Sequence, residues 1–266
     1  MAAEAAREPK TKLRKSARLE QILLELNLRS HVRTSELAER FNVSTETIRR
    51  DVEALSEEGL VSRAHVGASP PPHRHYPGFD ERNRARIEER ERIGRLAARL
   101  VEEGDTIMVD AGSTTLQFAR FLAYQGTACT VITNSLNAAT TLGRNPAIDI
   151  VLCPGDFLPS EAAVVGPDAI EFLHRHNVRK CFIGASSLSD EGLSETVRGF
   201  AAIKRAMLRQ SKETHLLVDG SKLGVPGLSR VGGLREIAAI VVDRAPQEPF
   251  GSAFERAGIR VLVAGG

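Results

Sequence analysis

The stretch Arg33–Val66, RTSELAERFNVSTETIRRDVEALSEEGLVSRAHV, carries the clearest fold signal in the chain. Thr34 or Ser35 is placed to cap one helix, and Ser44 is placed to cap the helix that begins with TETIRR. The Asn-Val pair between these helices predicts a tight turn. Two helices joined by such a turn, the second following a capping serine, are typical of a helix-turn-helix.

The second of these helices has a predicted buried face and a predicted exposed face. Apolar residues at i, i+4 and i+7 form its core stripe: Ile48, Val52 and Leu55. At about 100° per residue, Arg50 lies about 200° from Ile48, while Thr47 and Arg49 flank the stripe. An arginine on the outer face is able to read guanine in a major groove, and amides or hydroxyls are able to contact phosphates. The alternative is an amphipathic helix with ordinary surface charges.

A third helix and a hairpin complete the pattern around this pair. The segment from Arg18 onward has an apolar stripe at helical spacing, and residues 59–66 alternate apolar and polar side chains, which predicts the wing of a winged helix. Arg63 and His65 would then lie near the DNA backbone or minor groove. The residues predicted to contact DNA are Thr34, Ser44, Thr45, Thr47, Arg49, Arg50, Arg63 and His65.

Length and charge distribution predict two domains. At roughly 150 residues per domain, 266 residues fit two, and residues 7–18 hold six Lys/Arg against one Glu. Such a basic run is typical of a disordered arm, and before a DNA-binding unit it is placed to contact phosphates. The Gly- and Pro-rich stretch near 67–79 predicts a spacer. The predicted parts are an arm (1–17), a winged helix-turn-helix (18–67), a linker (68–79) and a larger domain (80–266).

The larger domain is predicted to be α/β, with a mostly parallel sheet and helices on both faces. After a charged helical stretch at 80–103, β-rich apolar runs alternate with helix-patterned segments. The predicted strands are 106–110, 129–133, 148–153, 180–184, 214–219, 239–243 and 259–263. The predicted helices are 114–124, 136–143, 166–175, 200–211 and 250–257.

Three polar loops follow predicted strands, where ligands bind in sheets of this kind. The run Asp110–Thr115 combines a glycine, three hydroxyls and a helix N-terminus, which suits a phosphate. A helix cap draws on the same residue types, and it remains an equal alternative for that run and for residues 133–135. In residues 219–224 a lysine is placed to neutralise phosphate, or else it is a surface lysine. The predicted effector-binding residues are Asp110, Gly112, Ser113, Thr114, Thr115, Asn134, Ser135 and Lys222.

These motifs resemble those of the DeoR family of bacterial transcription regulators. The block V-S-x-x-T-I-R-R-D at 43–51 is similar to the family's DNA-binding signature. The series D-x-G-S-T-T, T-N-S and D-x-S-K-x-G is similar to its effector domain. The resemblance implies a fold like that of ribose-5-phosphate isomerase and a phosphorylated sugar or related metabolite as ligand. It also implies a repressor of a carbohydrate or related catabolic operon, with an activator as the alternative.

Two departures from the family pattern stand out. Val66 replaces the first glycine of the usual His-Gly-Gly-Ala in the wing, and Phe200-Ala201-Ala202 replaces a usual Glu-Ala-Glu. The second change predicts a less polar or differently shaped effector, if that loop contacts the ligand.

An isomerase with an appended DNA-binding domain is the enzymatic alternative. Its reaction needs a positioned carboxylate base. The loop where relatives carry acidic residues reads Gly184-Ala185-Ser186-Ser187 here, and Asp190 and Glu191 belong to a predicted turn. We therefore expect binding without catalysis.

The remaining expectations concern partners and environment. We expect double-stranded operator DNA, a phosphorylated sugar-like effector and a second or further copies of the chain as partners, as a dimer or a tetramer. We expect no cofactor, no metal site, no membrane partner and no secretory signal, and so a cytoplasmic protein. Three cysteines without a C-x-x-C pair, Cys129, Cys153 and Cys181, predict buried free thiols.

Overall fold

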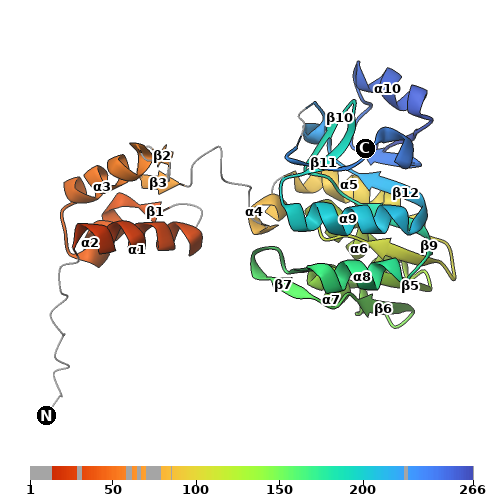
Figure 1. The fold of residues 1–266 in the computed structure, drawn as a ribbon, viewed down its shortest axis with the longest axis horizontal. Helices are drawn as coiled ribbons and strands as arrows, with labels where there is room; N and C mark the ends of the chain where they lie inside the picture. The colour runs from red at the N-terminus through yellow and green to blue at the C-terminus, as the bar shows by residue number, and fades with distance from the viewer. Residues whose placement is uncertain are drawn as a thin grey trace, which may run out of the picture. The chain divides into compact units, whose positions relative to one another are not determined.

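The chain forms two compact units, Met1–Tyr76 (unit 1) and Pro77–Gly266 (unit 2). The computed structural model, shown in Figure 1, describes residues 14–28, 32–57, 62–64, 67–69, 79–84, 86–224 and 227–265. Each unit is described by itself.

Unit 1 is a three-helix domain with a small antiparallel sheet, as predicted for a winged helix-turn-helix. Its helices are α1 (Lys15–Leu28), α2 (Thr34–Phe41) and α3 (Thr45–Glu57). Its sheet has the order β1-β3-β2, from β1 (Val32–Arg33), β2 (Ser62–Ala64) and β3 (Gly67–Ser69). The predicted core stripe of α3 is buried and packs against α1 and α2 in one apolar cluster: Ile22, Val32, Leu37, Ala38, Phe41, Ile48, Val52 and Leu55.

Three local expectations for unit 1 need correction or lie outside the described residues. Thr34 does not cap α2, because it is the first helical residue and Arg33 occupies the cap position. The hairpin continues to Ser69, so residues 68 and 69 are part of a strand and not of the linker. His65 and Val66 are not described, so the effect of Val66 on the wing turn stays a prediction.

Unit 2 is built on a seven-stranded parallel sheet with the order β15-β14-β12-β9-β4-β5-β6. All seven strands correspond to the seven predicted apolar runs: β4 (Thr106–Val109), β5 (Cys129–Thr133), β6 (Ile148–Leu152), β9 (Val178–Ile183), β12 (Ser211–Leu217), β14 (Ala239–Val242) and β15 (Arg260–Val263). The chain adds β5 and β6 on one side of β4 and then returns to place β9 on the other side. The strand order therefore reverses between β4 and β9, and open α/β sheets bind ligands at such a point.

Helices cover both faces of this sheet, as Figure 1 shows. One face packs against α8 (Pro167–His174), α9 (Arg198–Arg209) and α10 (Phe250–Ala257). The other packs against α5 (Ile87–Ala98), α6 (Ser113–Gln125) and α7 (Leu136–Leu142). Their apolar side chains and those of the sheet make two cores, one on each face of the sheet.

Several elements of unit 2 were not predicted. The charged stretch 80–103 is not one helix: α4 (Phe79–Arg84) and α5 are separate, and Arg86 between them has a φ of 50°. A hairpin of β7 (Asp156–Leu158) and β8 (Ala163–Val165) follows the sheet edge. A second small sheet joins β10 (Ser187–Ser189), β11 (Gly192–Glu195) and β13 (Ser229–Gly232). The strands of the hairpin and of the small sheet have only three or four residues, too few for an alternation of polar and apolar side chains to predict them.

The three cysteines are buried, as predicted. Burial raises the pKa of the Cys129 thiol to about 11, that of Cys153 to about 12 and that of Cys181 to about 11. Among the described residues, no helix combines the length and the apolar composition that a membrane crossing requires.

Candidate functional site

The N-terminus of α3 has the cap that the sequence predicted. The Ser44 hydroxyl accepts a hydrogen bond from the Thr47 backbone N–H at 3.1 Å, and the two hydroxyls lie 2.9 Å apart. Asn42 ends α2 with a φ of 52°, in the left-handed region that asparagine tolerates. The turn and cap fix where α3 begins, and hence which of its side chains face outward.

The outward face of α3 carries the two predicted arginines. The side chains of Arg49 and Arg50 are 70% and 77% exposed, and each lies within 4 Å of the exposed Glu46 carboxylate. Ion pairs this exposed are weak, so Glu46 holds neither guanidinium against a stronger partner such as a phosphate or a guanine edge. Of the wing residues, Arg63 lies in β2, while His65 is outside the described residues.

A buried ion pair that the sequence analysis missed holds α3 against α1. Arg18 donates from Nε and Nη2 to the Asp51 carboxylate at 2.5 and 3.1 Å, and both side chains are more than nine-tenths buried. Asp51 is the last residue of the V-S-x-x-T-I-R-R-D block, which therefore combines two exposed arginines with a buried anchor.

In unit 2, the predicted loops meet at the carboxyl end of the parallel sheet, where the strand order reverses. Asp110 directly follows β4, and its Oδ2 accepts a hydrogen bond from the backbone N–H of Gly184, which follows β9, at 3.0 Å. The carboxylate thus bridges the two strands at the switch point. Asp110 is 1% exposed, and its Oδ1 is buried without a hydrogen-bond partner among the described residues.

The Gly112–Thr115 turn begins α6 beside this carboxylate. Gly112 is the N-cap, and a β-carbon there would lie 3.1 Å from the Thr115 hydroxyl oxygen and 3.6 Å from Asp110 Oδ1, so the turn packs closely around this carboxylate. The Thr115 hydroxyl donates to the carbonyls of Asp110 and Gly112 at 3.1 and 3.0 Å, so its proton is engaged within the turn. The turn therefore offers the backbone amides at the helix N-terminus and the hydroxyls of Ser113 and Thr114 as donors.

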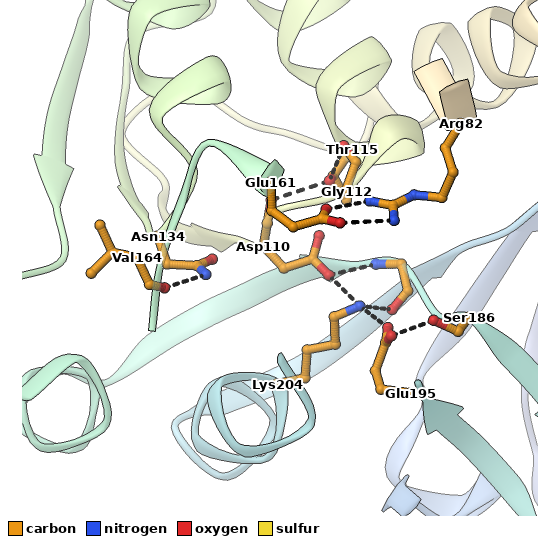
Figure 2. A network of polar contacts seen from close by, with 11 residues as sticks. Arg82, Asp110, Gly112, Thr115, Asn134, Glu161, Val164, Ser186, Glu195 and Lys204 are labelled. Atoms are coloured by element: carbon orange, nitrogen blue, oxygen red, sulfur yellow. Dashed lines mark hydrogen bonds and ion pairs between the residues drawn. The ribbon is translucent and has the colours of Figure 1, made fainter. Parts of the chain in front are cut away.

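A buried lysine organises the floor of the site, as Figure 2 shows. Lys204 on α9 pairs with Asp110 Oδ2 at 2.8 Å, pairs with Glu195 and donates to the Gly184 carbonyl at 2.8 Å. Burial alone would lower the pKa of Lys204, but the charges and hydrogen bonds of the two carboxylates outweigh it and raise that pKa. Its three N–H donors are all engaged, so Lys204 orients carboxylates and is not available to a ligand.

The second predicted loop divides between a buried side chain with an unpartnered oxygen and a helix cap. Asn134 donates from Nδ2 to the Val164 carbonyl at 2.9 Å, and its buried Oδ1 has no partner in the described parts of the chain. Ser135 accepts from the Ala138 backbone N–H at 3.1 Å and so caps α7. The capping alternative applies to Ser135, whereas Asn134 has an acceptor oxygen to spare.

The third predicted loop brings cations to the same site. Lys222 lies in the short helix η2 (Gly220–Lys222) after β12, and Asp219 caps that helix. Burial lowers the pKa of Lys222, and the charges of Arg90 and Arg82 lower it further, while Asp219 and Glu195 oppose the shift. Lys222 therefore lies close enough to two arginines and to the carboxylates of Asp219 and Glu195 to interact electrostatically with them.

Arg82 and Arg90 were not among the predicted site residues. Arg82 on α4 makes a bidentate ion pair with Glu161, which ends the helical turn η1 (Pro159–Glu161) between β7 and β8 (Figure 2). Arg90 on α5 pairs with Asp219 at 3.3 Å. In the sequence both arginines stand in a stretch of alternating charge, which reads as a solvated helix, and only the fold shows that they are buried.

The sequence analysis also missed Glu161, Glu195 and Lys204, because no local sequence motif marks them as site residues. Phe200, the aromatic residue in place of a family carboxylate, lies in the first turn of α9 and not before it. It is 2% exposed and packs against Ala111 and Ala163, so it forms an apolar wall directly beside the Gly112–Thr115 turn. Asp190 and Glu191 are exposed in the turn between β10 and β11, as predicted.

Comparison with known proteins agrees with both halves of this description. The profile of a family described as "DeoR-like helix-turn-helix domain" matches residues 18–71, and that of "DeoR C terminal sensor domain" matches residues 85–244. The HTH-type transcriptional repressor GlcR of Bacillus subtilis (strain 168) is 33% identical over 92% of this chain and 95% of its own length. The glycerol-3-phosphate regulon repressor of Escherichia coli (strain K12) is 31% identical over 81% of this chain and 86% of its own.

A ribose 5-phosphate isomerase from Methanocaldococcus jannaschii is similar over 53% of this chain and 56% of its own, with 21% identity and a TM-score of 0.40. That likeness is partial and says nothing of an activity. The two profiles and the near full-length repressor relatives are decisive, and the chain belongs to the DeoR family of DNA-binding transcriptional regulators.

Proposed function

We propose that this regulator is a repressor of a carbohydrate or related catabolic operon, and that a phosphorylated sugar or related metabolite controls it from the site in unit 2. The relatives named above are repressors, and one is named for a glycerol-3-phosphate regulon. The residues at the carboxyl end of the sheet suit a ligand that carries both hydroxyls and a phosphate.

One juxtaposition carries this proposal. Two buried acceptor oxygens, Asp110 Oδ1 and Asn134 Oδ1, lie at the ends of neighbouring strands, and the N-terminus of α6 begins beside them. The hydroxyls of a sugar would donate to those oxygens. Its phosphate would accept from the helix amides and face the positive charge of Lys222. A buried acceptor without a partner is costly, so a ligand that supplies the missing donors gains free energy.

The enzymatic alternative gains one observation, because Glu195 and Asp110 supply the carboxylates that the 184–187 loop lacks. Both, however, are ion-paired to Lys204, and the second oxygen of Glu195 accepts from the Ser186 hydroxyl. We therefore propose binding without turnover. Incubation of the protein with aldose and ketose phosphates should leave them unchanged, whereas an isomerisation that Glu195→Gln abolishes would establish an enzyme.

An operator titration tests the regulatory function. The DNA upstream of the protein's own gene is titrated by fluorescence anisotropy at several salt concentrations, with and without glucose 6-phosphate, ribose 5-phosphate and glycerol 3-phosphate. We expect salt-dependent, sequence-specific binding that at least one compound alters. Indifference of the protein to DNA sequence would contradict the proposal.

Lys222→Ala should abolish the response to the effector and leave operator affinity within a few fold, because Lys222 belongs to unit 2. The exposed Lys212 on β12 provides a matched control, Lys212→Ala, which should respond as wild type does. A Lys222→Ala protein that responds at the wild-type compound concentration would remove this residue from the site.

The partners follow from the same proposal. Regulators with a helix-turn-helix commonly read paired half-sites as symmetric dimers, so we propose a homo-oligomer of at least two chains acting on double-stranded DNA in the cytoplasm. Sedimentation at micromolar concentration should give a species larger than 28.9 kDa. A monomer with full operator affinity would contradict this.

A further inference from the structure

Helix α4 is the first described element of unit 2, and a buried ion pair holds it. Unit 2 begins at Pro77 and α4 begins at Phe79, so the chain from the DNA-binding unit leads directly into this helix. Arg82 of α4 and Glu161 pair through two hydrogen bonds, and their side chains are 8% and 6% exposed. A six-residue helix has little stability of its own, so its position depends on such contacts.

A second arginine ties α4 to the opposite rim of the site. Arg90 donates to the backbone carbonyl of Arg82 and, from Nε and Nη2, to the Asp219 carboxylate at 3.4 and 3.3 Å. Asp219 in turn holds the loop that carries Lys222. The Arg82 side chain therefore connects α4 to the β7–β8 hairpin. The Arg82 carbonyl connects the same helix, through Arg90, to the loop after β12.

Arg82 also lies close to where the proposed phosphate would bind. Helix α4 packs against α6, which begins at the Gly112–Thr115 turn. Glu161 stands two residues before Ala163, which belongs to one apolar cluster with Ala111, the residue that precedes this turn. The field of Arg82 reaches Lys222 as well. A phosphate held between the α6 amides and Lys222 would thus enter the surroundings of Arg82, where it would meet the negative charge of Glu161.

An arginine fork fits a carboxylate and a phosphate equally well in geometry, and a phosphate carries more charge. We infer that Arg82 exchanges partners: it holds Glu161 without effector and the effector's phosphate when that is bound. The exchange releases the β7–β8 hairpin and shifts α4, which transmits the signal toward the DNA-binding unit. This inference rests on the proposed function, because it names the residue through which the same site regulates operator binding.

Two variants separate this exchange from a purely structural brace. Glu161→Gln and Arg82→Gln both break the pair, so both should move the operator affinity of ligand-free protein toward that of effector-bound wild type. The size of that shift is the coupling factor, about 5–150-fold in typical regulators. Their effects on ligand binding should be opposite. Glu161→Gln removes a competing carboxylate and tightens binding, whereas Arg82→Gln removes a phosphate partner and weakens it about tenfold.

The full-length protein serves for every measurement. Operator affinity is measured by anisotropy, and binding of the three sugar phosphates and of inorganic phosphate by calorimetry. Hydrogen–deuterium exchange of peptides spanning residues 79–90 reports the position of α4, and exchange in the sheet strands verifies the fold. Glu171→Gln is the matched control, because it removes the carboxylate from the exposed Arg175–Glu171 pair on α8. Arg82→Lys keeps the charge without the fork and provides a milder variant if a glutamine variant unfolds.

Opposite effects on compound binding, together with a common shift in operator affinity and faster exchange in α4, would establish the partner exchange. Equal weakening of compound binding by both variants, or unchanged operator affinity, would show that the pair is only a brace and overturn the inference. Failure of all compounds to bind wild type would instead contradict the proposed effector class. The operator affinities and α4 exchange rates of the variants, which need no ligand, would then decide whether the pair controls the linker.

Discussion

Each unit of this protein contains a buried pair of arginine and carboxylate, and the two pairs differ in what surrounds them. Arg18–Asp51 joins residues 33 positions apart and ties one helix to another in the DNA-binding unit, where Arg49 and Arg50 are exposed. Arg82–Glu161 joins residues 79 positions apart and lies at a site with buried, unpartnered oxygens. The first pair therefore joins two helices of the scaffold in unit 1, whereas the second lies in unit 2 beside the proposed effector site.

The largest effect should come from breaking the scaffold pair. Asp51→Ala leaves Arg18 buried without its carboxylate, and removing one partner of a buried pair costs about 3–5 kcal/mol in the free energy of unfolding. Urea denaturation of unit 1, followed by circular dichroism, measures this loss. The exposed Glu39 on α2 provides the control, Glu39→Ala, with little expected change. A loss in the free energy of unfolding below about 1 kcal/mol for Asp51→Ala would show that Arg18–Asp51 does not stabilise the scaffold of unit 1.

Unit 2 should also be sensitive to acid through a buried histidine. His215 on β12 is 1% exposed and stacks on Phe182. Burial lowers its pKa from 6.5 to about 4, the charges of Arg260 and Lys180 assist, and Glu213 opposes. The folded form is thus neutral where the unfolded chain is protonated. The stability present above pH 6.5 should fall as the pH drops toward 4, by about 3 kcal/mol in total from this group.

Urea denaturation of unit 2 at pH 7, 6, 5 and 4.5 measures that loss. His215→Phe removes the titrating group and keeps an aromatic ring beside Phe182, so its stability should depend less steeply on pH. The exposed His174 supplies the control, His174→Gln, which should follow wild type. Equal slopes for wild type and His215→Phe would assign the acid sensitivity to other groups.

A substitution on the exposed face of α3 should have a smaller effect, and that effect should be limited to DNA binding. Arg50→Ala should cost about 1–3 kcal/mol of operator binding, because its guanidinium faces outward and only the exposed Glu46 pairs with it in the described contacts. The free energy of unfolding should stay within about 0.5 kcal/mol of wild type, as expected for an exposed side chain. Anisotropy titrations and urea denaturation of the same preparation give both values. Wild-type operator affinity would show that the helical wheel assigned Arg50 wrongly.

The two units also differ in how far the sequence predicts them. Ile48, Val52 and Arg50 are placed by one helical period, so the reading helix follows from residues close in sequence. The seven strands of unit 2 follow from local apolar runs in the same way. Its site follows only in part: Asp110 stands in a predicted loop, whereas Glu161 and Lys204 join it only through the strand order and the β7–β8 hairpin. A charged side chain in a charge-rich stretch gives no local sign that the fold will bury it, as Arg82 and Arg90 demonstrate.

One ligand at the carboxyl end of the sheet and operator DNA should influence each other through this chain, and reciprocity tests this coupling most directly. Calorimetry measures the affinity of the compound that alters the operator titration, first for the protein alone and then for the protein saturated with operator. Linkage requires the two coupling factors to be equal, so we predict that operator weakens effector binding by the factor by which effector weakens operator binding. Effector affinity that is unchanged by operator, in a protein whose DNA binding that compound had altered, would contradict the account.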